Sequence, residues 1–349
     1  MDNGEDQVGN GRKEEVYHDA EDMCLNGNGF ESHDGTKKIP SHNDEGDALG
    51  RPGERPGEVT AQMPVAKYAT HYKMDHKHRG KALIFNHEVF SCGSLKSRSG
   101  TNEDCSNLEN CLKCLGFDVE AYHNLTYAEL DAKIKQVADM NHSNHDCLFV
   151  AVLSHGELGI IYAKDTAYKP ESLWSRFTAD QCPSLAGKPK MFFLQACQGD
   201  KLDGGVNLRS NLGRTETDGE VHHNSYKIPA QADFLIVYST VKGYYSWRNT
   251  TKGSWFIQAL CEELRHRAHH SDLLTILTFV SQRVALDFES NVPDNQSMHR
   301  QKQIPCIMSM LTRFVQFTSV AGTMLDNNKV EKEGDKSKNA FTAFFSSKK

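Results

Sequence analysis

The sequence lacks a long hydrophobic run. Among its 349 residues, no apolar stretch approaches the roughly 18 that a membrane-spanning helix needs. Its first residues, MDNGEDQVGNGRKEE, contain no apolar segment, unlike a secretory signal peptide. We therefore expect the protein to be cytoplasmic.

The chain also lacks an excess of positive charge. Its formal net charge is −6 at pH 7 and its pI is about 6.3, which argues against general binding to nucleic acid. Hydrophobic residues make up 38 % of the chain, enough for a sizeable core. The mean hydropathy of −0.60 indicates that long polar stretches are present as well.

Paired metal-binding motifs are missing too. The chain has ten cysteines but a single Cys-x-x-Cys, formed by Cys111 and Cys114, and no second pair or histidines follow at zinc-binding spacing. Apolar periodicity puts this pair on a helix, so packing is the better interpretation. The tracts HKHR (76–79) and HH (269–270) have no ligand set nearby. We expect free thiols, no metal and no cofactor.

Three segments have no hydrophobic period. Residues 1–65 include the turn-rich run GRPGERPGE and are interpreted as a disordered leader. Residues 201–225 are rich in Gly, Asn, Thr, Asp and Glu, which is typical of a linker. Residues 318–349 form a charged tail that ends in AFTAFFSSKK; a disordered terminus is expected, with a docking peptide as the alternative.

Between these segments, apolar runs alternate with helical patterns. The runs are nearly continuous, as expected for strands covered on both faces, and such alternation predicts an α/β fold with a mostly parallel sheet. Strands are expected within residues 81–86, 116–122, 146–154, 189–196, 233–240 and 304–311. Helices are expected at 102–115, at 126–140 with a Thr126–Glu129 capping box, and at 254–266 and 272–288 with Ser254 and Asp272 as caps.

Two of the predicted strands end in reactive side chains. The run DCLFVAVLS leads into His155 and Gly156, and PKMFFLQA leads into Cys197. Functional groups collect at the carboxyl ends of parallel strands, so the imidazole and the thiol would emerge together if these strands are neighbours. The imidazole could take the thiol proton, and the N–H groups of Gly156 and Cys197 could stabilise an oxyanion. An isolated strand-end cysteine is usually an inert buried thiol, but the two motifs together favour nucleophilic catalysis.

Four motifs resemble the blocks that build a caspase active site. They are SRSGT (97–101), LSHGE (153–157), QACQG (195–199) and YYSWRN (244–249), in this order. The resemblance runs from about residue 81 to residue 317, and its closer features are similar to insect effector caspases. It implies a caspase-like α/β fold, in which helices flank both faces of a central, mostly parallel six-stranded sheet. One departure is Gln198, because many caspases have arginine there.

The resemblance implies an effector (executioner) caspase. Such a protein is a cysteine endopeptidase zymogen that cleaves proteins after aspartate, with an Asp-x-x-Asp preference, to execute apoptosis. His155 and Cys197 would be the catalytic pair. Arginine offers paired donors and a permanent charge, which suits a buried carboxylate. The residues implied to bind the substrate aspartate are Arg98, Gln195 and Arg248.

Further residues would line the substrate groove by the same resemblance. Asn249 and Trp255 would lie where an aspartate four residues before the cut is recognised. For Trp255, core packing at the start of a helix is an equal alternative. The rest of the implied groove consists of Tyr245, Ser246 and Trp247.

Both polar linkers contain sequences that such an enzyme would cut. Asp47 ends DEGD and Asp218 ends TETD, each before a small residue, although acidic linkers also produce such pairs by chance. Cleavage after Asp218 would separate a large subunit (66–218) from a small one (219–317). Cleavage after Asp47 would remove a leader and expose Ala48.

The resemblance also implies partners. Besides protein substrates, they are an upstream initiator caspase and inhibitor-of-apoptosis proteins that capture an N-terminal Ala48. The run IPCIMSML would be an aggregation hazard at an exposed sheet edge, and the resemblance puts it at the two-fold interface of a homodimer. Neither nucleic acid nor a membrane is expected as a partner.

Two other functions stay open. A catalytically inactive scaffold that binds caspases or inhibitors would need damage among the active residues, and the sequence retains all five: Arg98, His155, Gln195, Cys197 and Arg248. A related cysteine peptidase that cuts after Arg or Lys would need acidic side chains in its pocket, where this chain supplies two arginines.

Overall fold

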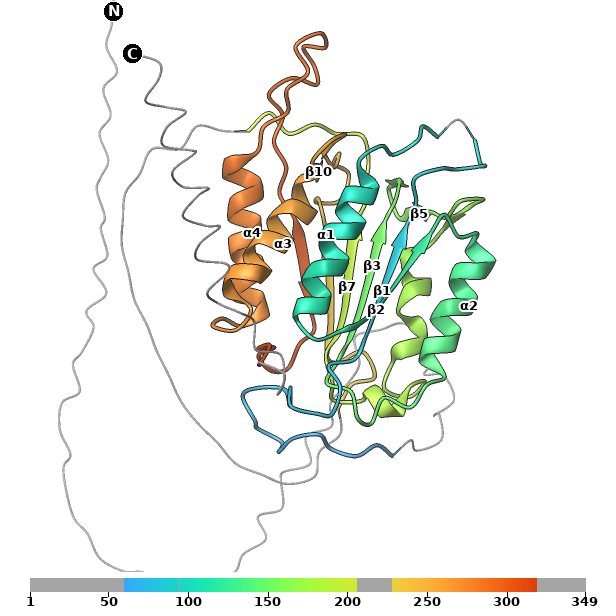
Figure 1. Ribbon diagram of the computed structural model, residues 1–349, viewed down its shortest axis with the longest axis vertical. Coiled ribbons are helices and arrows are strands. Elements are labelled where there is room, and N and C mark those ends of the chain that lie inside the picture. The colour runs from blue at the N-terminus through green and yellow to red at the C-terminus, as the bar shows by residue number, and fades with distance from the viewer. Residues whose placement is uncertain (1–59, 94, 206–227, 319–349) are drawn as a thin grey trace, which may run out of the picture. The chain divides into compact units, whose positions relative to one another are not determined.

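A six-stranded sheet runs through the molecule (Figure 1). The computed structural model describes residues 60–93, 95–205 and 228–318. The strand order is β11-β8-β7-β3-β1-β2, parallel throughout except for β11, which is antiparallel to β8. The strands are β1 (Lys81–Asn86), β2 (Asp118–His123), β3 (Leu148–Leu153), β7 (Lys190–Gln195), β8 (Phe234–Tyr238) and β11 (Cys306–Ser309).

Helices cover both faces of this sheet, so the predicted fold class is confirmed. Helices α1 (Thr101–Cys114), α3 (Trp255–Arg267) and α4 (Leu273–Asp287) lie on one face, and α2 (Tyr127–Ala138) lies on the other (Figure 1). Three short 3-10 helices, Pro170–Leu173, Ser175–Phe177 and Pro183–Leu185, join α2. Every residue of β3 and β7 is buried, because each strand has a hydrophobic cluster on either side.

All three predicted cap residues occupy the N-cap positions of their helices. Thr126 accepts from the N–H of Glu129 and forms the expected capping box, and Asp272 accepts from the first turn of α4. Ser254 occupies the cap position of α3, but its side chain makes no cap hydrogen bond. Its hydroxyl instead donates to Asp104 at 2.6 Å, so a tertiary partner has replaced the local one.

Five very short strands were not predicted from the sequence. They form a three-stranded sheet of β4 (Gly156–Glu157), β5 (Ile160–Tyr162) and β6 (Ala167–Tyr168), and a ribbon of β9 (Arg248–Asn249) and β10 (Gly253–Ser254). Runs of two or three residues are too short to show an alternating pattern. Both small sheets carry motif residues, so they matter for the site.

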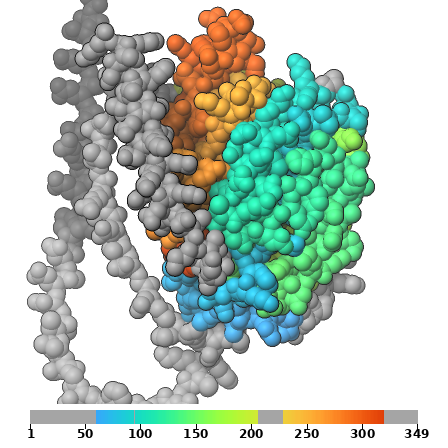
Figure 2. Space-filling view, in the orientation of Figure 1, coloured from blue at the N-terminus to red at the C-terminus, as the bar shows by residue number. Residues whose placement is uncertain are grey.

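Segments that are far apart in the sequence share one core. Figure 2 shows the teal surface of the α1 region directly against the orange surface of the α3–α4 region. Residues from both belong to a single buried cluster, which includes Leu108, Cys111, Leu260 and Cys261. The parts on either side of residues 206–227 are therefore packed together. Among the described helices, none has the length and apolar character to cross a membrane.

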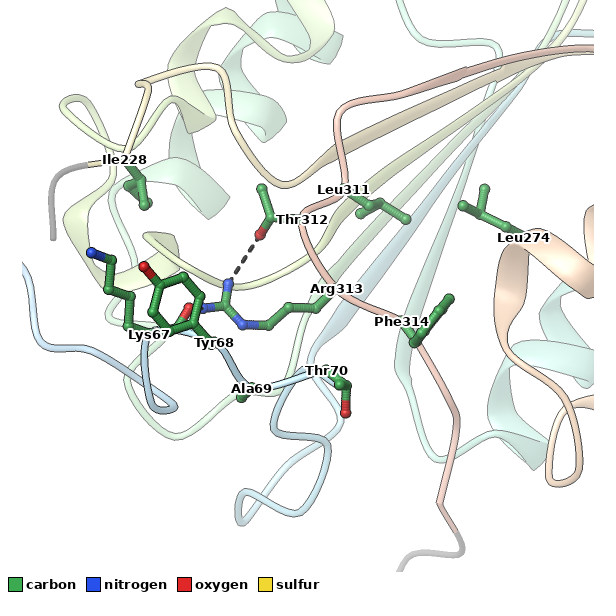
Figure 3. A pocket seen from close by; sticks show the side chains of 10 residues that line it. All are labelled: Lys67, Tyr68, Ala69, Thr70, Ile228, Leu274, Leu311, Thr312, Arg313 and Phe314. Atoms are coloured by element: carbon green, nitrogen blue, oxygen red, sulfur yellow. Dashed lines mark hydrogen bonds between the residues drawn. The ribbon is translucent and has the colours of Figure 1, made fainter. Parts of the chain in front are cut away.

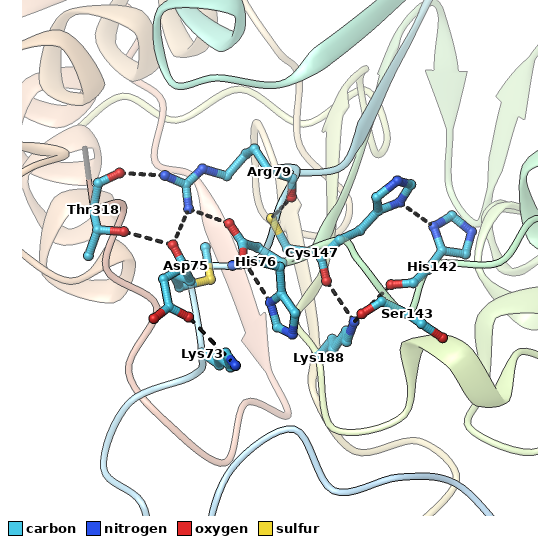
Figure 4. A network of polar contacts seen from close by, with 12 residues as sticks. Lys73, Asp75, His76, Arg79, His142, Ser143, Cys147, Lys188 and Thr318 are labelled. Carbon is cyan, nitrogen blue, oxygen red and sulfur yellow. Dashed lines mark hydrogen bonds and ion pairs between the residues drawn. The ribbon is translucent and has the colours of Figure 1, made fainter. Parts of the chain in front are cut away.

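A polar network closes the end of the sheet where the parallel strands begin (Figure 4). The guanidinium of Arg79, which precedes β1, is fully buried and pairs with Asp146 at 2.8 Å. It also donates to the carbonyl oxygens of Leu115, Met74 and Thr318. One charged side chain thus joins the start of the sheet to the end of the described chain.

We predict that Asp146→Ala lowers the free energy of unfolding by about 3–5 kcal/mol, because it leaves the Arg79 guanidinium buried without its counter-charge. Urea unfolding followed by tryptophan fluorescence, in a Cys197→Ser background, measures the change. The double variant Arg79→Met, Asp146→Leu is the control and should lose less stability than the single one. A loss below about 1 kcal/mol for Asp146→Ala would contradict the prediction.

Candidate active site

The register of two parallel strands brings His155 and Cys197 to the same edge of the sheet. Leu153 of β3 lies opposite Gln195 of β7, and the N–H of Ser154 donates to the Gln195 carbonyl at 3.0 Å. His155 and Cys197 each come two residues after that pair. The two strands are therefore neighbours in the sheet, as predicted.

His155 is held in one tautomer by a main-chain oxygen. Its Nε2 lies 2.7 Å from the Lys96 carbonyl, which can only accept, so Nε2 carries the proton. In the neutral ring this leaves Nδ1 as the basic nitrogen. The ring also packs on Phe90, with centroids 4.9 Å apart. Burial lowers the pKa of His155, and the charges of Arg98 and Arg248 lower it further.

Cys197 is a half-buried thiol beside the YYSWRN segment. The N–H of Ser246 donates to its sulfur at 3.3 Å. Burial raises the pKa of Cys197, although the Ser246 N–H and the two arginines oppose this rise. The raised pKa of the Cys197 thiol and the lowered pKa of the His155 imidazole therefore favour the neutral form of both groups at neutral pH.

The main chain of Gly156 lies against that of Cys197. A Cβ added to Gly156 would come within 2.5 Å of the Cys197 carbonyl oxygen and 2.9 Å of the Ala196 Cβ. Glycine is thus required for this approach. The two residues predicted to supply oxyanion donors are neighbours in the structure.

Arg98 is a fully buried cation, 1 % exposed. Its Nη1 donates to the His87 carbonyl at 3.0 Å and to the Thr101 hydroxyl at 2.7 Å. Burial and the charge of Arg248 lower the pKa of Arg98 to about 9. It stays protonated at neutral pH and provides a rigid positive group below the site.

Arg248 belongs to the other end of the chain but meets the same loop. Its Nε donates to the Ser99 carbonyl at 2.9 Å. A Cβ added to Gly100, whose φ is 88°, would lie 2.7 Å from the Asn249 carbonyl oxygen. The SRSGT loop and the β9–β10 ribbon are therefore interlocked, and the two predicted arginines belong to one site.

Gln195 contacts the site through hydroxyl groups. Its Nε2 donates to Ser246 Oγ at 2.9 Å, and Ser246 Oγ lies 2.9 Å from Ser239 Oγ. The side chain is buried, and its Oε1 has no hydrogen-bond partner. Gln195 and Ser246, both predicted for the site, are thus in direct contact.

The remaining groove residues form an aromatic row. Trp247 stacks on Trp255 with centroids 5.7 Å apart, and Trp255 stacks on Phe288 at 5.5 Å. Tyr245 packs against the outer side of Trp247 at 5.2 Å. Trp255 is 7 % exposed and is packed, but it also adjoins the groove, so both of its predicted roles are compatible with its position.

Asn249 is exposed, and its side-chain oxygen is engaged locally. Oδ1 accepts from the N–H groups of Thr251 and Lys252 at 2.9 and 2.8 Å. This fixes the turn between β9 and β10. The side-chain NH₂ group is the part that can donate to a ligand.

Three residues of the site were missed by sequence reasoning. Lys96 acts through its carbonyl, which carries no sequence signal. His87 follows the end of β1, as His155 follows β3, and burial together with Arg98 lowers its pKa to about 4. Asp104 is 1 % exposed on α1. Its helical spacing from Leu108 and Cys111 puts an acid on the buried face of a helix, and this signal was available.

Two hollows lie in the surface of the described residues, near opposite ends of β11. The larger, about 490 Å³, lies beyond β11 around Arg313, with Tyr68 and Phe314 in its wall (Figure 3). The smaller, about 280 Å³, is lined by Cys197, Gln198 and Tyr238. Cys197 lines the smaller hollow and not the larger one, so chemistry rather than size identifies the site.

Several predicted features lie outside the described residues. These are the cleavage sites Asp47 and Asp218, the new terminus Ala48 and most of the tail. Within the described part of the chain, no cluster of three or more His, Cys, Asp or Glu side chains could hold a metal ion. Cys111 is buried, whereas Cys114 of the same motif is exposed.

Comparison with known proteins identifies the class. The caspase domain family matches residues 79–316. Caspase-1 of Spodoptera frugiperda is 60 % identical over 292 residues, 84 % of this chain and 96 % of the relative. Caspase drICE of Drosophila melanogaster is 59 % identical over 258 residues, covering 74 % and 75 % of the two chains.

Solved caspase structures are similar to this chain in fold as well as in sequence. The crystal structure of the Spodoptera caspase-1 has a TM-score of 0.71 and 59 % identity, over 76 % of this chain and all of that one. A structure of pro-sf-caspase-1 has a TM-score of 0.60 and 61 % identity, over 75 % and 99 % of the two chains. The fold and the Cys–His edge thus define a cysteine endopeptidase directed at aspartate. The chain belongs to the caspase family.

We predict that iodoacetamide alkylates Cys197 with a rate that keeps rising above neutral pH. The raised pKa of Cys197 leaves little thiolate at pH 7, and only the thiolate reacts. Mass spectrometry of the Cys197 peptide measures the rate across pH 5.5–10, with the exposed Cys114 as an internal control. A plateau already reached below pH 7 would indicate a thiolate–imidazolium pair and contradict the prediction.

Proposed function

We propose that this protein works as an effector caspase, in which Cys197 is the nucleophile and His155 the acid–base group. The observation that carries the proposal is the common sheet edge of the two side chains beside two guanidinium groups. Its identity of 57–60 % to insect caspases supports the effector type. The expected setting is the cytoplasm during apoptosis.

The proposed reaction begins as the Cys197 sulfur attacks the main-chain carbonyl carbon of the substrate aspartate, whose bond to the next residue then breaks. Its proton passes to Nδ1 of His155, because Nε2 already donates to Lys96. The N–H groups of Gly156 and Cys197 stabilise the oxyanion. The imidazolium then protonates the leaving amine, and water hydrolyses the thioester to free the sulfur.

The substrate's own carboxylate assists this step. Burial lowers the pKa of His155, and the charges of Arg98 and Arg248 lower it further. A bound aspartate offsets their charge, so the imidazolium forms more easily once the correct substrate is present. This favours reaction of aspartate substrates over others.

Recognition of the aspartate rests on three donors in this proposal. Arg98 and Arg248 supply charged donors. Gln195 supplies the third donor if its side-chain amide rotates by about 180°. Its Oε1 would then accept from the Ser246 hydroxyl, and its NH₂ group would be available to the substrate carboxylate. That rotation also gives the unpartnered Oε1 a hydrogen bond. Tyr245, Ser246 and Trp247 would line the groove in which the peptide adds as a strand.

An aspartate four residues before the cut would be bound near the ribbon. Asn249 offers an exposed side-chain NH₂ group, and Trp255 anchors the aromatic row next to it. Together they support the Asp-x-x-Asp preference.

Processing at two aspartates would mature the enzyme. A cut after Asp218 gives a large subunit (66–218) and a small one (219–317), and a cut after Asp47 removes the leader. Support comes from the shared core, which would keep the two subunits together after the linker is cut. An upstream initiator caspase is the proposed activator, and a free Ala48 would bind inhibitor-of-apoptosis proteins.

The proposed assembly is a homodimer through β11. This strand lies at the sheet edge, and Met308 is 48 % exposed. Pairing with a second copy would cover an edge that is otherwise open to aggregation. The alternative of an inactive scaffold has no feature in its favour, because His155, Cys197 and both arginines are intact and close together.

We predict that Arg248→Ala lowers kcat/KM for an Asp-x-x-Asp peptide by at least about 2 kcal/mol, roughly thirtyfold, because a buried carboxylate loses one of its charged partners. Peptide hydrolysis by the mature enzyme measures this. Arg265→Ala on α3, a surface arginine that is 45 % exposed, is the matched control and should leave kcat/KM unchanged. Normal cleavage by Arg248→Ala would remove the pocket assignment.

We predict that Asp218→Ala blocks conversion of the chain to its two subunits. Gel electrophoresis of the purified protein after expression shows the fragments. Asp203→Ala is the control: Asp203 also precedes a glycine, but its carbonyl accepts from Lys302 N–H at 2.7 Å, and we expect no cleavage there. An Asp218→Ala protein that still yields both fragments with full activity would contradict the proposed cleavage after Asp218.

A further inference from the structure

Asp104 is a buried carboxylate that no motif of the site includes. It lies in the first turn of α1, directly after the loop that carries Arg98, and is 1 % exposed. Burying a carboxylate is costly unless it is hydrogen-bonded and near positive charge. Its position therefore calls for a physical reason.

Both side-chain oxygens of Asp104 accept hydrogen bonds from a single residue, Ser254, which lies in the part of the chain after residues 206–227. Oδ1 accepts from the Ser254 N–H at 2.7 Å, and Oδ2 accepts from the Ser254 hydroxyl at 2.6 Å. The two residues are 150 positions apart in the chain. In the β9–β10 ribbon, Ser254 lies opposite Arg248. The carboxylate thus fastens the ribbon of Arg248 to the helix that follows Arg98.

The ribbon is shaped to admit this carboxylate. Gly253, next to Ser254, has a φ of 88°, and a Cβ added there would lie 2.2 Å from Asp104 Oδ1. No side chain fits at that distance. The hydroxyl of Ser254 is free for this contact because it does not cap α3.

The charges around Asp104 make its burial tolerable. Burial raises the pKa of Asp104 to about 6, while Ser254, Arg98 and Arg248 oppose the rise, so the carboxylate is ionised at neutral pH. Among the described residues, no ion pair within 4.0 Å links Asp104 to either arginine. Its direct contacts are with Ser254, and through Ser254 it acts on Arg248.

We propose that Asp104 is a positioning residue for aspartate recognition, which clamps the Arg248 ribbon onto α1 through Ser254 and so fixes Arg248 relative to Arg98. The inference rests on the proposed function. Without the clamp, the ribbon would keep its short β9–β10 pairing but lose its fixed distance from the SRSGT loop. Binding of the substrate carboxylate would weaken, whereas the Cys197–His155 edge, which is built by β3 and β7, would be unaffected.

The test separates KM from kcat. Asp104→Ala should raise KM for an Asp-x-x-Asp peptide at least tenfold, with kcat within about threefold of the parent and an unchanged rate of Cys197 alkylation by iodoacetamide. Asp104→Asn has the same shape, can accept from the Ser254 N–H and can donate to its hydroxyl. It should therefore restore KM to within about threefold of the parent value.

Two further variants complete the comparison. Glu103→Ala, an exposed acid on the same turn of α1, is the matched control and should leave KM unchanged. Ser254→Ala removes one of the two clamp contacts and should raise KM by a smaller factor, about threefold. If Asp104→Ala does not fold, Ser254→Ala and Asp104→Asn carry the test.

Three results would overturn the inference: an unchanged KM in Asp104→Ala and Ser254→Ala, an equal loss of kcat and alkylation rate, or an Asp104→Asn variant as impaired as the alanine. Turnover of the same peptide by the parent enzyme tests the proposed function separately. If the parent enzyme cuts the peptide and the variants have the same KM as the parent, the clamp is rejected and the caspase assignment is kept.

Discussion

The parallel pairing of β3 with β7 is the constraint on which this molecule depends. Leu153 lies opposite Gln195 at the ends of the two strands, and each reactive side chain comes two residues later. A shift of one residue would move the imidazole about 3.3 Å along the thiol's strand. Helices on both faces bury these strands completely and so fix the register. Catalytic geometry is therefore a consequence of core packing.

A second constraint is the cost of gathering positive charge in an enclosed place. Burial lowers the pKa of Arg98 and of His155, and the charges of neighbouring arginines lower both further. Main-chain oxygens of His87 and Ser99 hold the two guanidinium groups. The contact between Arg248 and the Ser99 carbonyl joins the segments before and after residues 206–227. The proposed specificity pocket thus also joins the two parts of the chain.

Much of this could be read from the sequence, and the failures have a common cause. Continuous apolar runs located all six strands of the main sheet, since strands covered on both faces leave a strong pattern. Thr126 and Asp272 were recognised as caps because capping is local. Ser254 was also recognised as a cap residue, but its hydroxyl bonds to Asp104, 150 residues away, and no local pattern predicts that partner. The β9–β10 ribbon was missed because two-residue strands carry no period.

The sequence by itself determined the α-helices and the six strands of the main sheet, their order and the reactive residues. Local propensity and motif spacing are encoded within short windows, so Cys197, His155 and the two arginines could be named before any coordinates. Only the tertiary structure decided how they meet: the tautomer of His155 set by a Lys96 carbonyl, the interlocking of Gly100 with the ribbon, and the Asp104 clamp. Those contacts join main-chain atoms or residues far apart in the chain, and neither leaves a local pattern of side chains to read.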